Sequence, residues 1–295
     1  MSPVRLWVMA ARPRTLPAAI APVLVGTAAA VQVSGEIRVG AFIAALIGSV
    51  FIQIGTNLAN DYSDARRGAD TADRLGPVRV TSSGLVAPRR VLVATWVAFA
   101  VAVAAGIYLA TVAGVVILIV GAASILAGVL YTGGPRPYGY EGLGELFVFL
   151  FFGLVAVNGS YYVQLERLDW LPFGLSLAVG FLATAILVVN NVRDLETDRR
   201  AGKMTLAVRL GRQRTRSLYA LLIVAAFAAV PITLLAGDGP TWGLLALLAA
   251  PLVPRPVGAV MTRTDGPSLN GALAGTGALL AAFSALLAAG LVIAA

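Results

Sequence analysis

Nine long apolar stretches fill most of this 295-residue chain and restrict what it can fold into. Hydrophobic residues make up 59% of the sequence and charged residues only 12%, whereas soluble domains carry roughly 45–50% apolar and about 25% charged residues. Because a helix needs about 20 apolar residues to span a bilayer, we predict an all-α, polytopic membrane protein with a single integral membrane domain, 1–295. The nine expected transmembrane helices are 15–33, 39–58, 91–110, 112–131, 146–163, 171–190, 218–236, 242–260 and 271–294.

The sequence predicts two breaks in these stretches. The third and fourth follow each other almost without interruption, so the chain must turn tightly near 110–114. The eighth contains Pro254 and Pro256. Proline removes a helical hydrogen-bond donor and crowds the preceding turn, so we expect this helix to bend or end there.

The distribution of basic residues tests the topology independently. If the N-terminus is inside, 20 of the 22 Lys and Arg residues fall on the inner side, and only Arg38 and Arg167 fall outside. Basic residues are enriched in cytoplasmic loops. We therefore expect a multi-pass protein of the cell membrane with its N-terminus and active site in the cytoplasm and its C-terminus outside. The arginines lie in short loops and not on one soluble face, which excludes a nucleic-acid partner.

The chain contains no cysteine and no histidine. This excludes disulfide scaffolds, zinc–thiolate sites and every mechanism that needs a histidine base or a cysteine nucleophile. The charged residues that remain are concentrated in two inner loops, 57–90 and 190–216, which hold 7 of the 14 acidic and 14 of the 22 basic residues. We expect the active site at these two loops.

Acidic and amide side chains recur at helical spacing at the start of both loops. Positions i, i+4 and i+7 or i+8 lie on one face of a helix, so each set forms a polar stripe where an apolar span ends. The two sets lie 130 residues apart, which indicates an internal repeat of four helices with a site at the repeat interface. The first set is Asn57, Asn60, Asp61 and Asp64; the second is Asn190, Asp194 and Asp198.

Stacked carboxylates repel one another and require cations in a medium of low dielectric constant. Oxygen ligands without His or Cys indicate Mg²⁺, which commonly completes its shell with phosphate oxygens and water. Nearby basic residues would then compensate the rest of a diphosphate. These are Arg66, Arg67, Arg193, Arg199 and the only lysine of the chain, Lys203.

Five segments in order along the chain resemble a known family. They are ARPRTLP at 11–17, NLANDYSD at 57–64, GPVR at 76–79 with Ser83 and Gly84, YTGGPRPY at 131–138, and NNVRD at 190–194 with GKMTL at 202–206. In combination they resemble the UbiA superfamily of intramembrane prenyltransferases. They are most similar to its 1,4-dihydroxy-2-naphthoate polyprenyltransferase (MenA) branch.

This resemblance implies a nine-helix bundle with a cavity open to the cytoplasm and to lipid. It implies Mg²⁺-dependent transfer of a polyprenyl chain from its diphosphate to 1,4-dihydroxy-2-naphthoate, with loss of CO₂ and diphosphate, giving demethylmenaquinone for menaquinone biosynthesis. The implied catalytic residues are Asp61, Asp64, Asp194 and Asp198, which with Asn60 and Asn190 also form the metal site. The expected diphosphate-binding residues are Arg12, Arg66, Arg67, Arg136, Arg199 and Lys203, and the expected lid or substrate residues are Asn57, Arg79, Ser83, Tyr131 and Tyr138.

The chain departs from the superfamily pattern at three positions. The third acid of the first motif falls on Gly68, which leaves Asp70 or Asp73 to complete the first metal site. The first acid of the second motif is Asn190, a neutral oxygen ligand. A lysine expected after the turn at 131 falls on Pro135, and the neighbouring Arg136 becomes the candidate base.

In the mechanism that we expect, metal ions and bases neutralise the departing diphosphate so that the allylic C–O bond ionises. Apolar walls then shield the allylic cation from water until the ring carbon captures it. The loop 76–88, with Ser82-Ser83-Gly84, is either a lid over the diphosphate or an ordinary surface loop. Asp61 and Glu141 are the two candidates for a base that accepts a proton from the acceptor.

Alternative functions share some of these features. A related enzyme could use 4-hydroxybenzoate, homogentisate or a glycerol-phosphate lipid as acceptor, and only the segments 12–17, 76–84 and 131–138 favour naphthoate. A secondary transporter for a phosphorylated anion also fits internal repeats and intramembrane charge. Against the transporter, the acids cluster at one face of the membrane instead of at the midplane.

Overall fold

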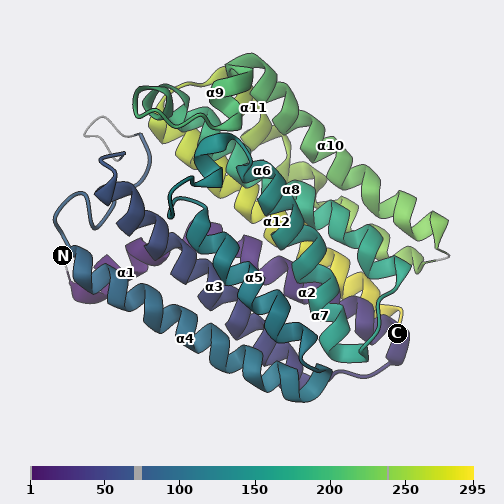
Figure 1. The fold of residues 1–295 in the computed structure, drawn as a ribbon. Helices are drawn as coiled ribbons and strands as arrows, with labels where there is room; N and C mark the ends of the chain where they lie inside the picture. Colours follow the sequence, from purple (N-terminus) through teal and green to yellow (C-terminus); the bar gives the residue numbers. More distant parts are fainter. Residues whose placement is uncertain (1, 70–74, 238) are drawn as a thin grey trace.

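The computed structural model describes residues 2–69, 75–237 and 239–295, and these residues form helices joined by short loops, with no strand among them (Figure 1). The predicted all-α class is therefore confirmed. In chain order the elements are α1 (Pro3–Ala11), η1 (Pro13–Thr15), α2 (Pro17–Ser34), α3 (Val39–Arg66), α4 (Pro88–Ala113), α5 (Val116–Leu130), η2 (Tyr138–Glu141), α6 (Gly144–Val148), η3 (Phe149–Val155), α7 (Ala156–Leu165), α8 (Trp170–Arg200), α9 (Leu206–Leu210), α10 (Arg212–Ala236), η4 (Thr241–Leu252), α11 (Pro254–Thr262) and α12 (Gly266–Ile293).

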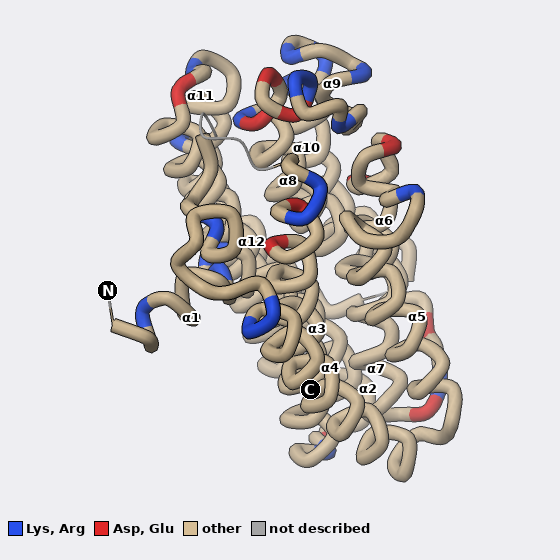
Figure 2. The backbone as a smooth tube through the Cα atoms, turned by 60° about the vertical axis from the view of Figure 1, so that its left-hand side comes forward, with Lys and Arg blue, Asp and Glu red and all other residues tan. Residues whose placement is uncertain are grey.

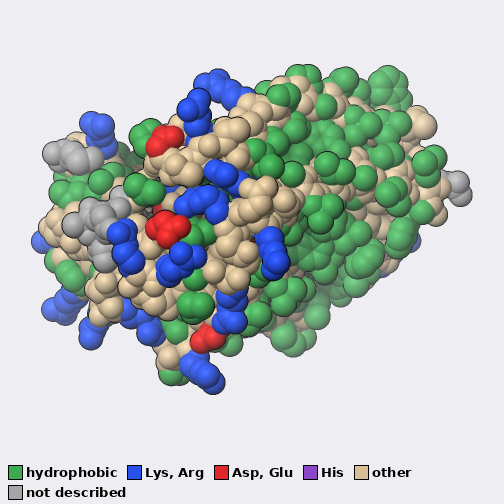
Figure 3. All heavy atoms as spheres, turned by 90° about the horizontal axis from the view of Figure 1, so that it is seen from above, with side chains coloured by type: hydrophobic (Ala, Val, Ile, Leu, Met, Phe, Trp, Pro, Cys, Tyr) green, Lys and Arg blue, Asp and Glu red, His purple; other side chains and the backbone are tan. Residues whose placement is uncertain are grey.

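Seven helices of the described chain are long and apolar enough to cross a membrane, so the protein is a multi-pass membrane protein. An eighth span is available if η4 and α11 are taken together, and α5 is shorter, with 15 residues. Each of the nine predicted stretches has a helical counterpart, but a count of nine spans stays a prediction. Charged side chains gather at one end of the molecule and hydrophobic ones cover the rest of the face in Figure 3.

Both predicted breaks are present. Helix α4 ends at Ala113, and Gly114 then takes a φ of 84°, a left-handed conformation that glycine adopts at little cost. The chain reverses there into α5. Helices η4 and α11 meet at a bend of 45°, directly before Pro254. The prolines therefore break the eighth stretch as expected from their missing donors.

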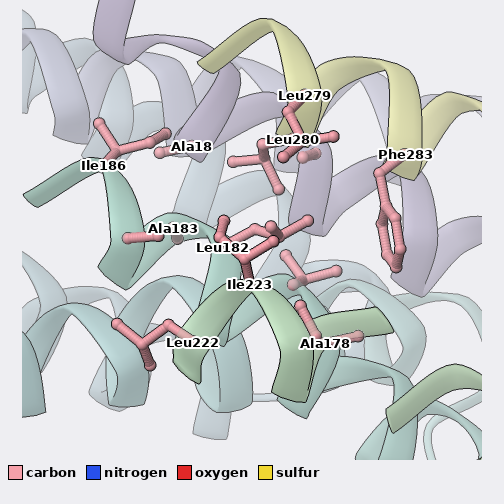
Figure 4. Packing of buried hydrophobic residues seen from close by; sticks show 14 of the residues in the cluster. Ala18, Ala178, Leu182, Ala183, Ile186, Leu222, Ile223, Leu279, Leu280 and Phe283 are labelled. Carbon is pink, nitrogen blue, oxygen red and sulfur yellow. The ribbon is translucent and has the colours of Figure 1, made fainter. Parts of the chain in front are cut away.

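The most extensively buried helix is α8, and it forms the centre of one half of the bundle. It packs against α10, α12, α2 and the π-helical turn η3. Its residue Leu182 lies beside Ile223 of α10, and Ile186 points towards Ala18 of α2 (Figure 4). A Cβ added at Gly153 of η3 would lie only 2.7 Å from Gly180 of α8, so only glycine allows this approach.

The two helices that carry the polar motifs are longer than a bilayer requires. Helix α3 has 28 residues and α8 has 31, which at 1.5 Å per residue gives about 42 and 46 Å, against a hydrocarbon core of about 30 Å. Both motifs lie on the C-terminal turns of these helices. The apolar spans predicted to end at 58 and 190 thus continue as helix through the polar residues, which keeps the motifs on rigid supports.

Candidate active site

A cavity of about 340 Å³ opens between α3 and α8. Its polar end is lined by both predicted motifs, with Asp64 from α3 and Asp194 from α8. Its other walls are apolar and come from α3, α4, α5, η3 and α7. One chamber therefore places charged groups beside a long hydrophobic surface, which suits a ligand with a charged head and an apolar tail.

Asp64 connects four separate segments of the chain. Its Oδ2 lies 3.1 Å from Lys203 Nζ and 3.1 Å from Arg79 Nη2. Its Oδ1 accepts a hydrogen bond of 2.6 Å from the Tyr140 hydroxyl. Asp64 is only 1% exposed, and a buried carboxylate requires such partners. The contact with Lys203 brings the segment that follows the second motif onto the first motif.

The Asp61 carboxylate accepts hydrogen bonds from the backbone of the loop 76–87. Its Oδ2 accepts from the Val80 amide at 3.1 Å, and its Oδ1 accepts from the Thr81 amide at 2.9 Å. Val80 itself is fully buried and packs against Leu58. Asp61 is not among the residues that line the cavity, so its predicted metal-binding and catalytic roles stay predictions, while its observed contacts hold a loop.

Asp194 of the second motif is paired with its own neighbour. Arg193 donates from Nε to Asp194 Oδ1 at 2.8 Å and from Nη2 to Asp194 Oδ2 at 2.6 Å. The same guanidinium donates to Asn190 Oδ1 and to Asn270 Oδ1 of α12, each at 2.8 Å. Arg193 is 2% exposed. It therefore neutralises Asp194 and joins the end of α8 to α12.

The predicted amides of α3 hold neighbouring segments. Asn60 Oδ1 accepts from the Thr132 hydroxyl at 2.8 Å, next to the predicted Tyr131. Asn57 Nδ2 donates to the Ala11 carbonyl at 3.0 Å and to Thr15 Oγ1 at 3.2 Å. Both amides also line the cavity. The segments around the first helix and after α5 are thereby fixed against α3.

Several other predicted residues also lie on the cavity wall. They are Arg12, Arg79, Tyr131, Tyr138, Asn190, Asp198 and Lys203. The remaining predicted residues lie outside the cavity. Arg66 donates to the Tyr62 hydroxyl, and Arg67 donates to the Gly134 carbonyl. Arg199 donates to Glu196, the Ser83 hydroxyl donates to the Arg79 carbonyl, and Arg136 is exposed. The candidate base Glu141 pairs with Arg209 at the surface. Asp70 and Asp73 lie outside the described residues.

Three residues at or beside the cavity are not among the predicted ones: Tyr140, Asn191 and Glu145. Tyr140 binds Asp64, and Lys203 Nζ lies 4.8 Å from the centre of the Tyr140 ring. Asn191 lines the cavity and donates to Glu145 Oε1 at 2.8 Å. The repeated aromatic pattern around 138–140 was the available signal for Tyr140. The Asn191–Glu145 pair joins positions 46 residues apart, and no local pattern indicates it.

Two tyrosines of the cavity wall have raised pKa values. Burial, followed by the negative charge of Glu145, raises the pKa of Tyr131 well above its ordinary value. Burial likewise raises the pKa of Tyr138, whose hydroxyl donates to the Ala127 carbonyl at 2.9 Å. Burial favours the neutral phenol, which keeps its proton and therefore has no basic oxygen to offer. These residues can therefore orient a ligand but are unsuited to act as bases.

The cavity wall combines three carboxylates with three basic side chains: Asp64, Asp194 and Asp198, and Arg12, Arg79 and Lys203. Figure 2 shows charged residues concentrated around α9 and the neighbouring end of α8, with few along α2 and α7. Within the described residues no group of three or more acidic side chains is arranged to hold a metal ion, because the two best-placed carboxylates bind Lys203, Arg79 and Arg193 instead. Five of the six predicted metal ligands nevertheless line one cavity: Asn60, Asp64, Asn190, Asp194 and Asp198.

Residues 19–268 match the sequence profile of the UbiA prenyltransferase family. The chain belongs to the UbiA prenyltransferase family. It is 46% identical over 271 residues to a 1,4-dihydroxy-2-naphthoate octaprenyltransferase of Mycobacterium tuberculosis, covering 92% of this chain and 91% of that one. It is 39% identical to the Escherichia coli protein of the same name, covering 95% and 93%.

Solved UbiA structures share the fold. A UbiA homolog from Aeropyrum pernix superimposes with a TM-score of 0.70 at 14% identity, over 93% of this chain and 97% of that one. A homolog from Archaeoglobus fulgidus, solved with GPP and Mg²⁺, superimposes with a TM-score of 0.62 at 15% identity, over 96% and 99%. The predicted UbiA-like bundle is thereby confirmed.

The hydrogen bonds of Asp61 should hold the loop 76–87 even when no metal is bound. Asp61→Ala removes the acceptor of two buried amides, which costs roughly 1–3 kcal/mol per unsatisfied group. We expect the amides of Val80 and Thr81 to exchange hydrogen faster in the metal-free variant, as measured by hydrogen–deuterium exchange mass spectrometry. Asp265→Ala, which removes a helix cap at Ser268, is the control. Unchanged exchange at 80–81 would contradict the loop role.

Proposed function

We propose that this protein transfers a polyprenyl chain from its diphosphate to 1,4-dihydroxy-2-naphthoate, with release of diphosphate and CO₂, and so forms demethylmenaquinol in menaquinone biosynthesis. The observation that carries this proposal is the cavity in which the basic and acidic groups around Asp64 adjoin a long apolar wall. The relatives at 46% and 39% identity are both named 1,4-dihydroxy-2-naphthoate octaprenyltransferase. These names support naphthoate as the acceptor over 4-hydroxybenzoate or homogentisate.

The basic residues of the cavity would bind the diphosphate. Lys203 Nζ and Arg79 Nη2 each lie 3.1 Å from Asp64 Oδ2. Arg12 lines the same cavity. An incoming diphosphate offers these cations a stronger anionic partner than one carboxylate. Neutralising the oxygen that leaves favours cleavage of the allylic C–O bond. The bonding electrons leave with diphosphate, and the ring carbon supplies the pair for the new C–C bond.

The donor set fits Mg²⁺, because it consists of carboxylate and amide oxygens. Asp64, Asp194 and Asp198 would hold the ion, with Asn60 and Asn190 as neutral oxygen ligands. When bound, the ion adds positive charge beside the diphosphate. If Asp64 and Asp194 held the ion, their present partners Lys203, Arg79 and Arg193 would be available to compensate the charge of the diphosphate.

The apolar part of the cavity would hold the polyprenyl chain and keep water from the allylic cation. Phe147, Phe151 and Leu187 border it near the polar end, and Leu109 and Ile117 border it farther away. None of these side chains carries a nucleophile that could capture the cation before the acceptor does. The loss of the acceptor carboxylate as CO₂ returns its bonding electrons to the ring, which restores aromaticity without removal of a proton from that carbon.

We further propose the cell membrane as the location, with the cavity's polar end and the N-terminus in the cytoplasm. The chain ends lie at opposite ends of the bundle in Figure 1, which fits an odd number of crossings. The excess of basic residues at the polar end supports a cytoplasmic orientation.

Activity should depend on Asp64 and on a divalent ion. With Mg²⁺, a polyprenyl diphosphate and carboxyl-labelled 1,4-dihydroxy-2-naphthoate, the purified protein should release labelled CO₂, and EDTA should stop the release. We expect Asp64→Asn to lower the rate about 100-fold or more. Glu196→Gln alters an exposed acid of α8 outside the cavity and should keep the rate. Product from 4-hydroxybenzoate alone would reassign the acceptor.

Two cavity glycines should govern the length of donor that is accepted. A Cβ added at Gly121 or Gly159 would meet no atom within 4 Å, so both border open space. We expect Gly121→Phe and Gly159→Phe to lower kcat/KM for long polyprenyl diphosphates about tenfold or more, while geranyl diphosphate reacts as before. Gly258→Phe also points into open space but outside the cavity, and serves as control. Equal loss for both donors would count against a chain-binding wall.

The orientation can be measured by single-cysteine labelling, because the chain has no cysteine. Ser83→Cys places a thiol in the exposed loop 76–87, and Leu168→Cys places one between α7 and α8. In intact spheroplasts, a membrane-impermeant maleimide should label Leu168→Cys and should label Ser83→Cys only after lysis. The opposite pattern would reverse the orientation.

A further inference from the structure

A second concavity, separate from the catalytic cavity, lies on the outer surface where α1 meets α3 and α4. Its volume is about 860 Å³. We call it the α1–α4 groove and define it by Trp7 and Val8 of α1, Phe51 and Ile54 of α3, and Val93 and Val97 of α4. Val8, Val93 and Val97 are each at least 50% exposed, so this groove offers an open apolar surface. Figure 1 shows α1 beside the first turns of α4.

Two arginines border this otherwise apolar groove. Arg89 and Arg90 belong to the first turn of α4, line the groove and are exposed. Neither forms an ion pair or a side-chain hydrogen bond with any described residue. The first turn of α4 carries no acidic residue, so the positive end of this 26-residue helix adds to their charge.

The side chains that line the groove suit a ligand with an anionic head and an apolar tail. Apolar walls suit an acyl chain, and two adjacent guanidinium groups suit a phosphate. The groove's lining contains no Asp or Glu, so the amine of a zwitterionic headgroup would find no carboxylate there. The groove lies on α3 and α4, both long enough to cross the membrane, at the end where charged side chains gather, which is the depth of lipid headgroups.

We propose that the α1–α4 groove is a binding site for an anionic phospholipid. The lipid phosphate binds Arg89 and Arg90, and one acyl chain lies between α1 and α4 against Val93, Ala94 and Val97. Basic pockets between membrane helices attract anionic headgroups in this way. The site is distinct from the proposed donor site, because none of its lining residues lines the catalytic cavity.

The groove is linked to the catalytic cavity through α1. Ala11 lines the groove and the next residue, Arg12, lines the cavity. Asn57 of the cavity donates to the Ala11 carbonyl at 3.0 Å, and its neighbour Leu58 lines the groove. A lipid that holds α1 against α3 and α4 therefore also holds the backbone that positions Arg12.

The test is retention of lipid by the purified full-length protein. Protein reconstituted in mixtures of phosphatidylglycerol and phosphatidylcholine is examined by native mass spectrometry as lipid is removed. Wild type should retain one phosphatidylglycerol in preference to phosphatidylcholine. R89Q/R90Q should bind it about 30-fold more weakly, which corresponds to the attraction of two surface basic residues. Ala94→Trp keeps both arginines but fills the groove and should also lose the lipid.

A matched double variant controls for net charge. R214Q/R255Q removes two exposed arginines outside the groove and should retain phosphatidylglycerol like wild type. The inference is overturned if R89Q/R90Q and Ala94→Trp, both eluting as folded protein, retain the lipid like wild type. It is also overturned if the control double variant loses as much binding, since the attraction would then follow total charge and not the groove.

Discussion

The buried carboxylate of Asp64 accepts from a lysine, an arginine and a tyrosine that belong to three different segments. In a medium of low dielectric constant an uncompensated charge is too costly to keep, so these partners are required for α3 to bring an acid to the cavity. The same contacts draw the loop 76–87, the turn at 138–141 and the segment after α8 to one point. Arg193 has the corresponding role for Asp194. Charge compensation thus organises the polar end of the bundle as much as hydrophobic packing organises its core.

The two halves of the bundle differ in packing, and this difference places the cavity. Around α8 the helices fit closely, with Gly153 and Gly180 in near backbone contact and Leu182, Leu279 and Leu280 fully buried. Around α3, α4 and α5 the helices leave space that small residues such as Gly121 do not fill. A rigid half therefore supports the second motif, while the looser half offers apolar room beside the first.

The sequence was sufficient to predict the helical class, the turn at Gly114, the break before Pro254 and the convergence of the two motifs on one cavity. These follow from hydropathy, backbone chemistry and helical spacing, all of which are local. The sequence does not predict which groups each charged side chain binds. The sequence does not indicate that the oxygens of Asp61 accept from the Val80 and Thr81 amides, or that Arg66, Arg67, Arg136 and Arg199 lie outside the cavity; the metal and diphosphate roles of these residues stay predictions. Such contacts depend on the path of loops, which no local pattern encodes.

The length of α3 and α8 has a consequence for how a substrate arrives. Each helix exceeds the hydrocarbon thickness by roughly 12–16 Å, and each carries its acids on the excess. With the apolar part of the bundle in the hydrocarbon layer, the charged end of the cavity would lie level with the phosphate layer, and its apolar part level with the acyl chains. A long-chain diphosphate dissolved in the bilayer already has its head and tail at these two depths. In the function that we propose, such a donor would keep its tail among the acyl chains and its charge among the headgroups while it is bound.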